Sequence, residues 1–176
     1  EKPFIVKPNQ EGSSIGFFKV NSEKEFLKAI RVNKKITNEI LIEEYIEGRE
    51  ITVPIIDQKV LPIVEIKPNN KIYDYESKYV PGKSKYIVPA NIDLDIQSKI
   101  SKNSIDMYSK VGCNSYSRLD FILSKNNTPY FLELNTYPGM TQTSLFPKSA
   151  LLCGIEFDEL ILELVAMKSE KQKFQK

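Results

Sequence analysis

Two strand-like segments near the C-terminus constrain the fold of this chain more than any other feature. The runs Tyr116–Leu123 and Tyr130–Asn135 are largely apolar, and the polar, turn-prone stretch 125–128 separates them. This pattern predicts a β-hairpin. We expect Ser124 to pair with Pro129 across the turn, which fixes the partners of every residue further along the hairpin.

Charged residues interrupt both predicted strands. With that pairing, Asp120 lies opposite Glu133 and Arg118 lies opposite Asn135. Like charges placed directly opposite each other destabilise a sheet, and burying unpaired carboxylates costs still more. A divalent cation between the two carboxylates would remove the conflict. The sequence therefore predicts a metal site here, and the alternative is a solvated sheet face that carries charges.

The composition indicates a globular protein and argues against two kinds of partner. The chain has 176 residues, of which 41% are hydrophobic and 27% are charged, which suits one domain or two small lobes. Its formal net charge of +2 gives no electrostatic reason to expect binding to nucleic acid or to an anionic membrane. Neither a membrane-spanning run nor a signal-peptide pattern is evident.

The chain contains no histidine. This excludes a Ser-His-Asp or Cys-His nucleophile, a histidine-ligated zinc ion and an imidazole base from these residues. Catalysis here would depend on carboxylates, amines, hydroxyls, backbone donors and metal. Such a set suits phosphoryl transfer, in which positioning and charge stabilisation supply most of the rate.

The cysteines and the first residues give two further expectations. Cys113 and Cys153 lie far apart in apolar surroundings, which favours buried thiols in a cytoplasmic protein over a disulfide. Glu1 is not an initiator methionine, and Phe4–Lys7 immediately resembles a buried strand. We therefore expect the chain to be part of something longer.

The remaining patterns predict an α+β fold. A capping box formed by Ser22 and Glu25 predicts the start of one helix, whose apolar face would contain Phe26, Leu27 and Ile30. Further elements are expected as strands at 4–7, 15–20, 40–42, 50–56 and 60–66 and as helices from about 93 to 111, near 149 and from about 157.

Three loops could carry chemistry, and each has a simpler alternative. The glycine-serine loop 11–16 follows Lys7 and could bind phosphate through backbone N–H groups, or could be a plain turn. The acidic stretch 43–50 is either a solvated turn or a hinge that contacts a nucleoside. The aperiodic segment 68–89 could cover an apolar edge or act as a lid that brings Lys78 and Tyr79 to a phosphate.

The stretch after the second strand of the hairpin is the most specific of all. Residues 135–144 contain Pro138 and Gly139 in a tight turn, followed by several hydroxyl side chains. The N–H groups of such a turn are well placed to stabilise an oxyanion.

Taken in order, these motifs resemble the D-alanine–D-alanine ligases of the ATP-grasp superfamily. The resemblance covers essentially the whole chain, and the matching residues are Val6-Lys7-Pro8, Glu11-Gly12-Ser13-Ser14, Tyr73-Asp74-Tyr75-Glu76, Lys78-Tyr79, Arg118, Asp120, Glu133-Leu134-Asn135-Thr136 and Pro138-Gly139-Met140-Thr141. The resemblance implies an ATP-grasp fold with two lobes, each a mostly antiparallel sheet with packed helices, and nucleotide between them. It places residues 1–46 in the central lobe and residues 47–176 in the C-terminal lobe, with a lid at about 68–89.

The resemblance also implies the reaction and its cofactors. ATP would phosphorylate one D-alanine, and a second D-alanine would displace phosphate to give a dipeptide for peptidoglycan synthesis. The implied cofactors are ATP and two Mg²⁺ ions, with Mn²⁺ as a substitute. The implied partners are these small molecules, without nucleic acid or membrane, in a cytoplasmic enzyme for which a homodimer is an open alternative. Two alternative functions remain open. The protein could be another ATP-grasp carboxylate–amine ligase with a different acceptor, or a truncated nucleotide-binding fragment that has no activity by itself.

Family roles transfer to individual positions. Asp120, Glu133 and Asn135 are similar to the metal ligands, and Lys7, Glu43, Ile46, Glu50 and Lys78 to nucleotide contacts. Arg118 and the Gly139 amide resemble the groups that stabilise the tetrahedral intermediate, Ser144 and Leu145 those that hold the second substrate, and Ser13, Lys78 and Tyr79 those that close over it. The family's N-terminal domain and the opening part of its ATP-binding domain have no counterpart in this sequence, so we expect weak nucleotide binding and no turnover from the isolated chain.

Overall fold

The computed structural model describes residues 3–68 and 84–173. They form two compact units. The first contains the described residues of Glu1–Glu47 and Pro68–Lys85, and the second those of Gly48–Lys67 and Tyr86–Lys176. Each unit has its own sheet and its own apolar core.

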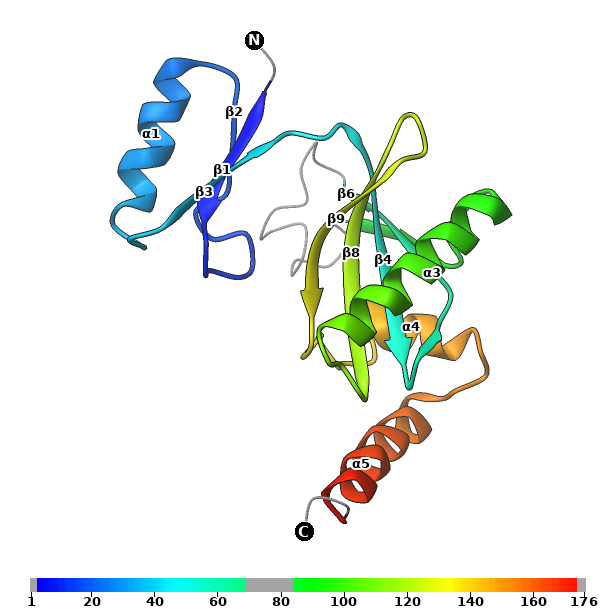
Figure 1. The fold of residues 1–176 in the computed structure, drawn as a ribbon. Helices are drawn as coiled ribbons and strands as arrows, with labels where there is room; N and C mark the ends of the chain where they lie inside the picture. Colours follow the sequence, from blue (N-terminus) through cyan, green and yellow to red (C-terminus); the bar gives the residue numbers. More distant parts are fainter. Residues whose placement is uncertain (1–2, 69–83, 174–176) are drawn as a thin grey trace. The chain divides into compact units, whose positions relative to one another are not determined.

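The first unit is a three-stranded antiparallel sheet covered by one helix (Figure 1). Strand β1 (Phe4–Pro8) lies between β2 (Phe18–Val20) and β3 (Ile40–Glu44). Helix α1 spans Glu23–Asn33 and packs on the sheet through a small core. The buried members of that core are Val6, Val20 and Ala29.

The start of α1 confirms one prediction and corrects two others. Ser22 is the N-cap, and its hydroxyl accepts a hydrogen bond from the Glu25 amide, as the capping box requires. The Glu25 carboxylate, however, accepts from the amide of Asn21 at 2.6 Å, one residue earlier than expected. The predicted apolar position Leu27 is 54% exposed, because Ala29 provides the contact to the sheet instead.

The second unit is built on a six-stranded sheet with the order β7-β6-β4-β8-β9, and β5 also pairs with β4. The bounds are β4 Gly48–Ile56, β5 Lys59–Val60, β6 Val64–Pro68, β7 Ser84–Ile87, β8 Tyr116–Ser124 and β9 Pro129–Asn135. The strand expected at 60–66 is therefore two strands. Pro62 has no N–H to donate to a continuous ladder, and the chain between β5 and β6 is irregular.

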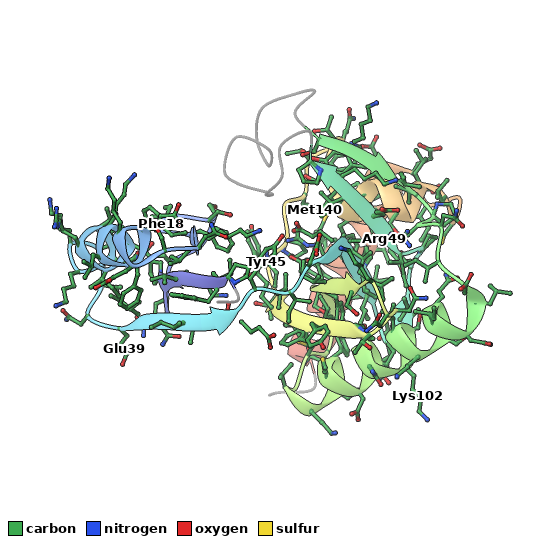
Figure 2. All side chains as sticks on the ribbon, turned by 90° about the horizontal axis from the view of Figure 1, so that it is seen from above. Phe18, Glu39, Tyr45, Arg49, Lys102 and Met140 are labelled. Atoms are coloured by element: carbon green, nitrogen blue, oxygen red, sulfur yellow. The ribbon has the colours of Figure 1, made fainter. Side chains whose placement is uncertain are left out.

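Helices cover the two faces of this sheet differently. Helix α3 (Leu94–Lys110) crosses one face, and α4 (Leu145–Leu151) lies on the other (Figure 1). The core under α3 contains alternate residues of β4 and β8, and Lys102 on the outer side of α3 points away from the sheet (Figure 2). A second core joins α4 to α5 (Phe157–Lys173) and the sheet through Ile56, Phe146 and Leu160.

The predicted hairpin forms, but its register at the turn is not the one assumed. Leu123, rather than Ser124, pairs with Pro129. A β-bulge at Leu132 then restores the predicted partners further along, so that Asp120 pairs with Glu133. The bulge has a packing reason: it lets Phe131 lie against Phe121 on the α3 face, with the two ring centroids 5.7 Å apart. A regular hairpin would turn Phe131 to the opposite face.

The cysteine expectation is partly wrong. Both thiols are free, as predicted, but Cys153 is exposed and only Cys113 is partly buried. Separately, within the described residues, none of the helices is both long and apolar enough to cross a membrane.

Candidate metal and nucleotide site

Four predicted residues gather on the sheet face opposite α3. Arg118 and Asp120 lie two positions apart on β8, and their partners on β9 are Asn135 and Glu133. Side chains two positions apart on a strand share a face, so all four project to the same side. We call these residues the carboxylate strip.

Asp120 is the buried centre of the strip. Asp120 is only 7% exposed. The Arg118 guanidinium donates a hydrogen bond to each oxygen of its carboxylate, from Nε to Oδ1 at 2.9 Å and from Nη2 to Oδ2 at 2.7 Å. This two-point ion pair changes part of the sequence hypothesis. Arg118 already provides a positive charge for Asp120, so the facing carboxylates do not require a metal ion for the fold to form.

Glu133 and Asn135 complete a set of oxygen donors. Glu133 is exposed beside the buried Asp120, and the Asn135 side-chain oxygen accepts a hydrogen bond from the Tyr137 amide at 2.9 Å. Two carboxylates and one amide oxygen on one face suit a hard divalent cation such as Mg²⁺. Among the described residues, His, Cys, Asp and Glu side chains do not form any cluster of three that could hold a metal, so the third donor of the strip is the amide.

The loop after β9 is organised by the Ser144 hydroxyl. Ser144 Oγ accepts from the Thr141 amide at 3.1 Å and lies 2.8 Å from the Thr141 hydroxyl oxygen. A methyl group added at Gly139 would lie 3.2 Å from Ser144 Oγ, a tight contact that the hydroxyl would have to relieve by a small shift. Leu145, the first residue of α4, is buried, and its side chain packs rather than facing solvent. The structure thus brings Gly139, predicted to stabilise the tetrahedral intermediate, close to Ser144, a predicted contact of the second substrate.

Glu50 is the remaining predicted nucleotide contact of the second unit. It pairs with Ile66 on one side and Ile122 on the other. These partners place Glu50 on the same face of the sheet as Asp120, two positions along β4 from the residue that pairs with Asp120.

In the first unit, two predicted nucleotide contacts bind each other. Lys7 Nζ lies 2.8 Å from the Glu43 carboxylate, and both side chains are about a third exposed, at 28% and 37%. Ile46 is partly buried in the segment after β3. Ser13 lies in the glycine-serine loop with a positive φ of 53°, followed by Ser14 at 61° and Gly16 at 68°. Such left-handed residues are uncommon outside glycine and mark a tightly wound loop.

The predicted lid contacts Lys78 and Tyr79 lie outside the described residues.

Two polar features of the second unit were missed by sequence reasoning. Thr52, fully buried on β4, donates a hydrogen bond to Asp120 Oδ1. On the α3 face, buried Glu65 accepts two hydrogen bonds from Arg49, which also donates to the backbone oxygen of Asn91. Burial alone would raise the pKa of Glu65, but the hydrogen bonds and charge of Arg49 outweigh it and lower that pKa. A polar residue within an otherwise apolar strand was the available signal for Thr52.

Solved structures define the class of this fold. The D-alanine–D-alanine ligase from Bacillus anthracis is 34% identical, with a TM-score of 0.86 over 99% of this chain and 57% of the ligase. Its complex with ATP gives 33% identity and a TM-score of 0.82 over 99% of this chain and 56% of the other. The VanG D-Ala:D-Ser ligase from Enterococcus faecalis is 28% identical, with a TM-score of 0.80 over 94% of this chain and 49% of that ligase. The fold is therefore the ATP-grasp fold predicted from the sequence.

Sequence comparison narrows the class to one family. The family model described as D-ala D-ala ligase C-terminus matches residues 1–166, so the chain belongs to this family. The D-alanine–D-alanine ligase of Methylacidiphilum infernorum is 44% identical over 167 residues, which cover 93% of this chain and 55% of that ligase. The chain spans about half the length of the curated relatives it matches.

Proposed function

We propose that this chain provides the metal-binding part and much of the nucleotide-binding part of an ATP-dependent ligase that joins two D-alanines. The observation that carries the proposal is the direct pairing of Asp120 with Glu133, with Asn135 on the same face. Membership of the ligase family and the likeness to an ATP-bound relative support it.

The proposed reaction has two steps. The carboxylate of the first D-alanine takes the γ-phosphoryl group of ATP, which gives an acyl phosphate and ADP. The amine of the second D-alanine then attacks the acyl carbon, the bond to phosphate breaks, and D-alanyl-D-alanine and phosphate are released. Asp120, Glu133 and Asn135 would hold two Mg²⁺ ions, for which Mn²⁺ can substitute, and such ions neutralise phosphate charge during the transfer.

The other residues of the second unit receive roles that fit their chemistry. Arg118 is a permanent cation, suited to stabilising negative charge on the reacting carbonyl, and the Gly139 amide is a backbone donor for the same oxygen. Ser144 and the amide of Leu145 would bind the carboxylate of the second D-alanine. Glu50 would accept hydrogen bonds from ribose hydroxyls.

In the first unit, we propose that Lys7 contacts ATP phosphate, and that Glu43 and Ile46 contact the adenine. The Lys7–Glu43 ion pair supports this, because both side chains remain partly exposed and can exchange a surface partner at little cost. Ser13, Lys78 and Tyr79 would close over the substrates. The proposed setting is the cytoplasm, in peptidoglycan precursor synthesis, and the proposed assembly is a homodimer, which light scattering would test.

The decisive experiment uses a chimera in which the N-terminal half of the Methylacidiphilum infernorum ligase precedes residue 1. We expect phosphate release only when ATP, Mg²⁺ and D-alanine are all present, and D-alanyl-D-alanine as the product in mass spectrometry. The complete M. infernorum ligase is the positive control. If a folded chimera releases phosphate at the same rate with and without D-alanine, the proposal is rejected.

The likeness to a D-Ala:D-Ser ligase makes the acceptor a separate question. D-serine, D-lactate and L-amino acids offered to the same chimera in competition with D-alanine decide it. A preference for D-serine would keep the ligase chemistry and change the product.

A further inference from the structure

Asp120 has a second neighbour besides Arg118. Thr52 lies directly opposite it on the adjoining strand β4, so that Asp120 stands between Thr52 on one side and Glu133 on the other. Thr52 is 0% exposed. Its hydroxyl position is therefore set by strand pairing and by the restricted χ1 of a β-branched side chain, rather than by solvent.

The Thr52 hydroxyl has two acceptors within reach but only one hydrogen to donate. The Asp120 Oδ1 atom is 2.5 Å from Thr52 Oγ1, and the backbone oxygen of Leu119 is 3.4 Å away. A hydrogen bond to a carboxylate is roughly twice as strong as one between neutral groups. The hydroxyl hydrogen is thus assigned to Asp120.

The two oxygens of the Asp120 carboxylate are used unequally. Among the described residues, Oδ1 accepts hydrogen bonds from Thr52 and from Arg118 Nε, whereas Oδ2 accepts one from Arg118 Nη2. A carboxylate oxygen offers about two lone-pair sites. Oδ1 is therefore filled by protein donors, and Oδ2 retains the capacity to bind a cation.

We propose that Thr52 is a positioning residue for the metal site: its hydroxyl occupies Asp120 Oδ1 and orients the carboxylate so that Oδ2 is presented to Mg²⁺. This inference rests on the proposed function, because it takes Asp120 as a metal ligand. Hydrogen-bonding partners of metal ligands commonly matter in this way, and their loss weakens metal binding about 10–100-fold.

The test measures Mn²⁺ affinity rather than turnover. The chimera described above is titrated with MnCl₂ alone, because a nucleotide in solution would itself chelate the metal, and free Mn²⁺ is followed by electron paramagnetic resonance. We expect Thr52→Val, which keeps the side-chain shape, to weaken Mn²⁺ binding about 10–100-fold. Thr52→Ser keeps the hydroxyl and should restore most of the affinity.

A matched control comes from the same sheet. Ser117 is fully buried on β8, and its position places it on the face opposite Asp120. The Ser117 hydroxyl lacks a hydrogen-bond partner in the described part of the chain. Ser117→Ala should therefore leave Mn²⁺ affinity unchanged, which shows that loss of a buried hydroxyl from this sheet is not by itself enough.

Asp120→Asn separates failure of this inference from failure of the proposed function. If Asp120→Asn weakens Mn²⁺ binding but Thr52→Val does not, the role of Thr52 is rejected and the metal site stands. If neither change has an effect, both are rejected. Equal losses in Thr52→Val and Thr52→Ser would show that the hydroxyl is not responsible. If the valine variant does not fold, Thr52→Ala removes the same hydroxyl without adding a group and is scored in the same way.

Discussion

Arg118 and Asp120 form a two-point ion pair within a single strand, although they are separated by one residue. Both side chains are largely buried, at 19% and 10% exposed, so the pair is shielded from solvent. The first prediction follows from this relationship. Arg118→Met leaves a buried carboxylate without its counter-charge, and we expect a loss of about 3–5 kcal/mol in the free energy of unfolding, measured with urea.

The control for this prediction is a double-mutant cycle. Asp120→Asn in the Arg118→Met background removes the unpaired charge and should recover much of the lost stability. Additive losses from the two substitutions would contradict a direct interaction between the side chains.

The second prediction concerns the pH dependence of stability and uses the ion pair between the partly exposed Arg49 and the buried Glu65. The pKa of Glu65 is lowered in the folded protein, so its contribution is present above the ordinary pKa of about 4.3 and is lost as pH falls through the lower folded value. Because the Arg49 side chain is 39% exposed, we expect Glu65→Gln to cost only about 1–2 kcal/mol at pH 7.

Urea unfolding of both proteins between pH 7 and pH 3 measures this effect. The difference in the free energy of unfolding between the unsubstituted chain and Glu65→Gln should shrink as the pH falls below about 4.3, the ordinary pKa of glutamate. A constant difference across the whole range would show that Glu65 is not held as a carboxylate by Arg49.

The third prediction tests the glycine-serine loop. A methyl group at Gly16 would collide with the Asn33 side-chain oxygen and with the ring of Pro8, at a φ of +68°. We expect Gly16→Ala to lower the free energy of unfolding by about 1–3 kcal/mol. Gly12→Ala is the matched control, since nothing lies within 4 Å of its added methyl group. Equal effects of the two changes would argue against the packed arrangement of Gly16 on Asn33.

The fourth prediction distinguishes the two thiols. Cys153 is exposed and should react rapidly with a disulfide reagent at pH 7. Burial raises the pKa of Cys113, so little of it is thiolate and it should react much more slowly. A biphasic reaction that loses its fast phase in Cys153→Ser would agree with this. A single fast phase for both thiols would not.

Local features were predictable from the sequence because their signals lie within a few residues. Helix α3 was predicted at about 93–111 from its apolar spacing and is found at Leu94–Lys110. The hairpin followed from two apolar runs and a short polar turn. The pairing of Asp120 with Glu133 was predicted correctly from an incorrect register at the turn, because the Leu132 bulge offsets the error.

Features that depend on distant parts of the chain were not predictable in the same way. Thr52 and Asp120 are 68 positions apart, and only the pairing of β4 with β8 brings them together. The bulge depends on Phe131 packing against Phe121, which a pattern of charges cannot reveal. The single strand expected at 60–66 from its apolar composition is divided into β5 and β6, because Pro62 between them cannot donate a backbone hydrogen bond.

The extra residue at Leu132 gives the hairpin separate alignments at its tip and at its acidic end. Pairing at the tip is therefore one residue out of step with pairing at Glu133, and substitutions at residues 125–127 that keep the length of the turn leave this offset unchanged. A fluorophore or affinity handle attached at exposed Asn126 would report on the second unit while leaving the carboxylates undisturbed.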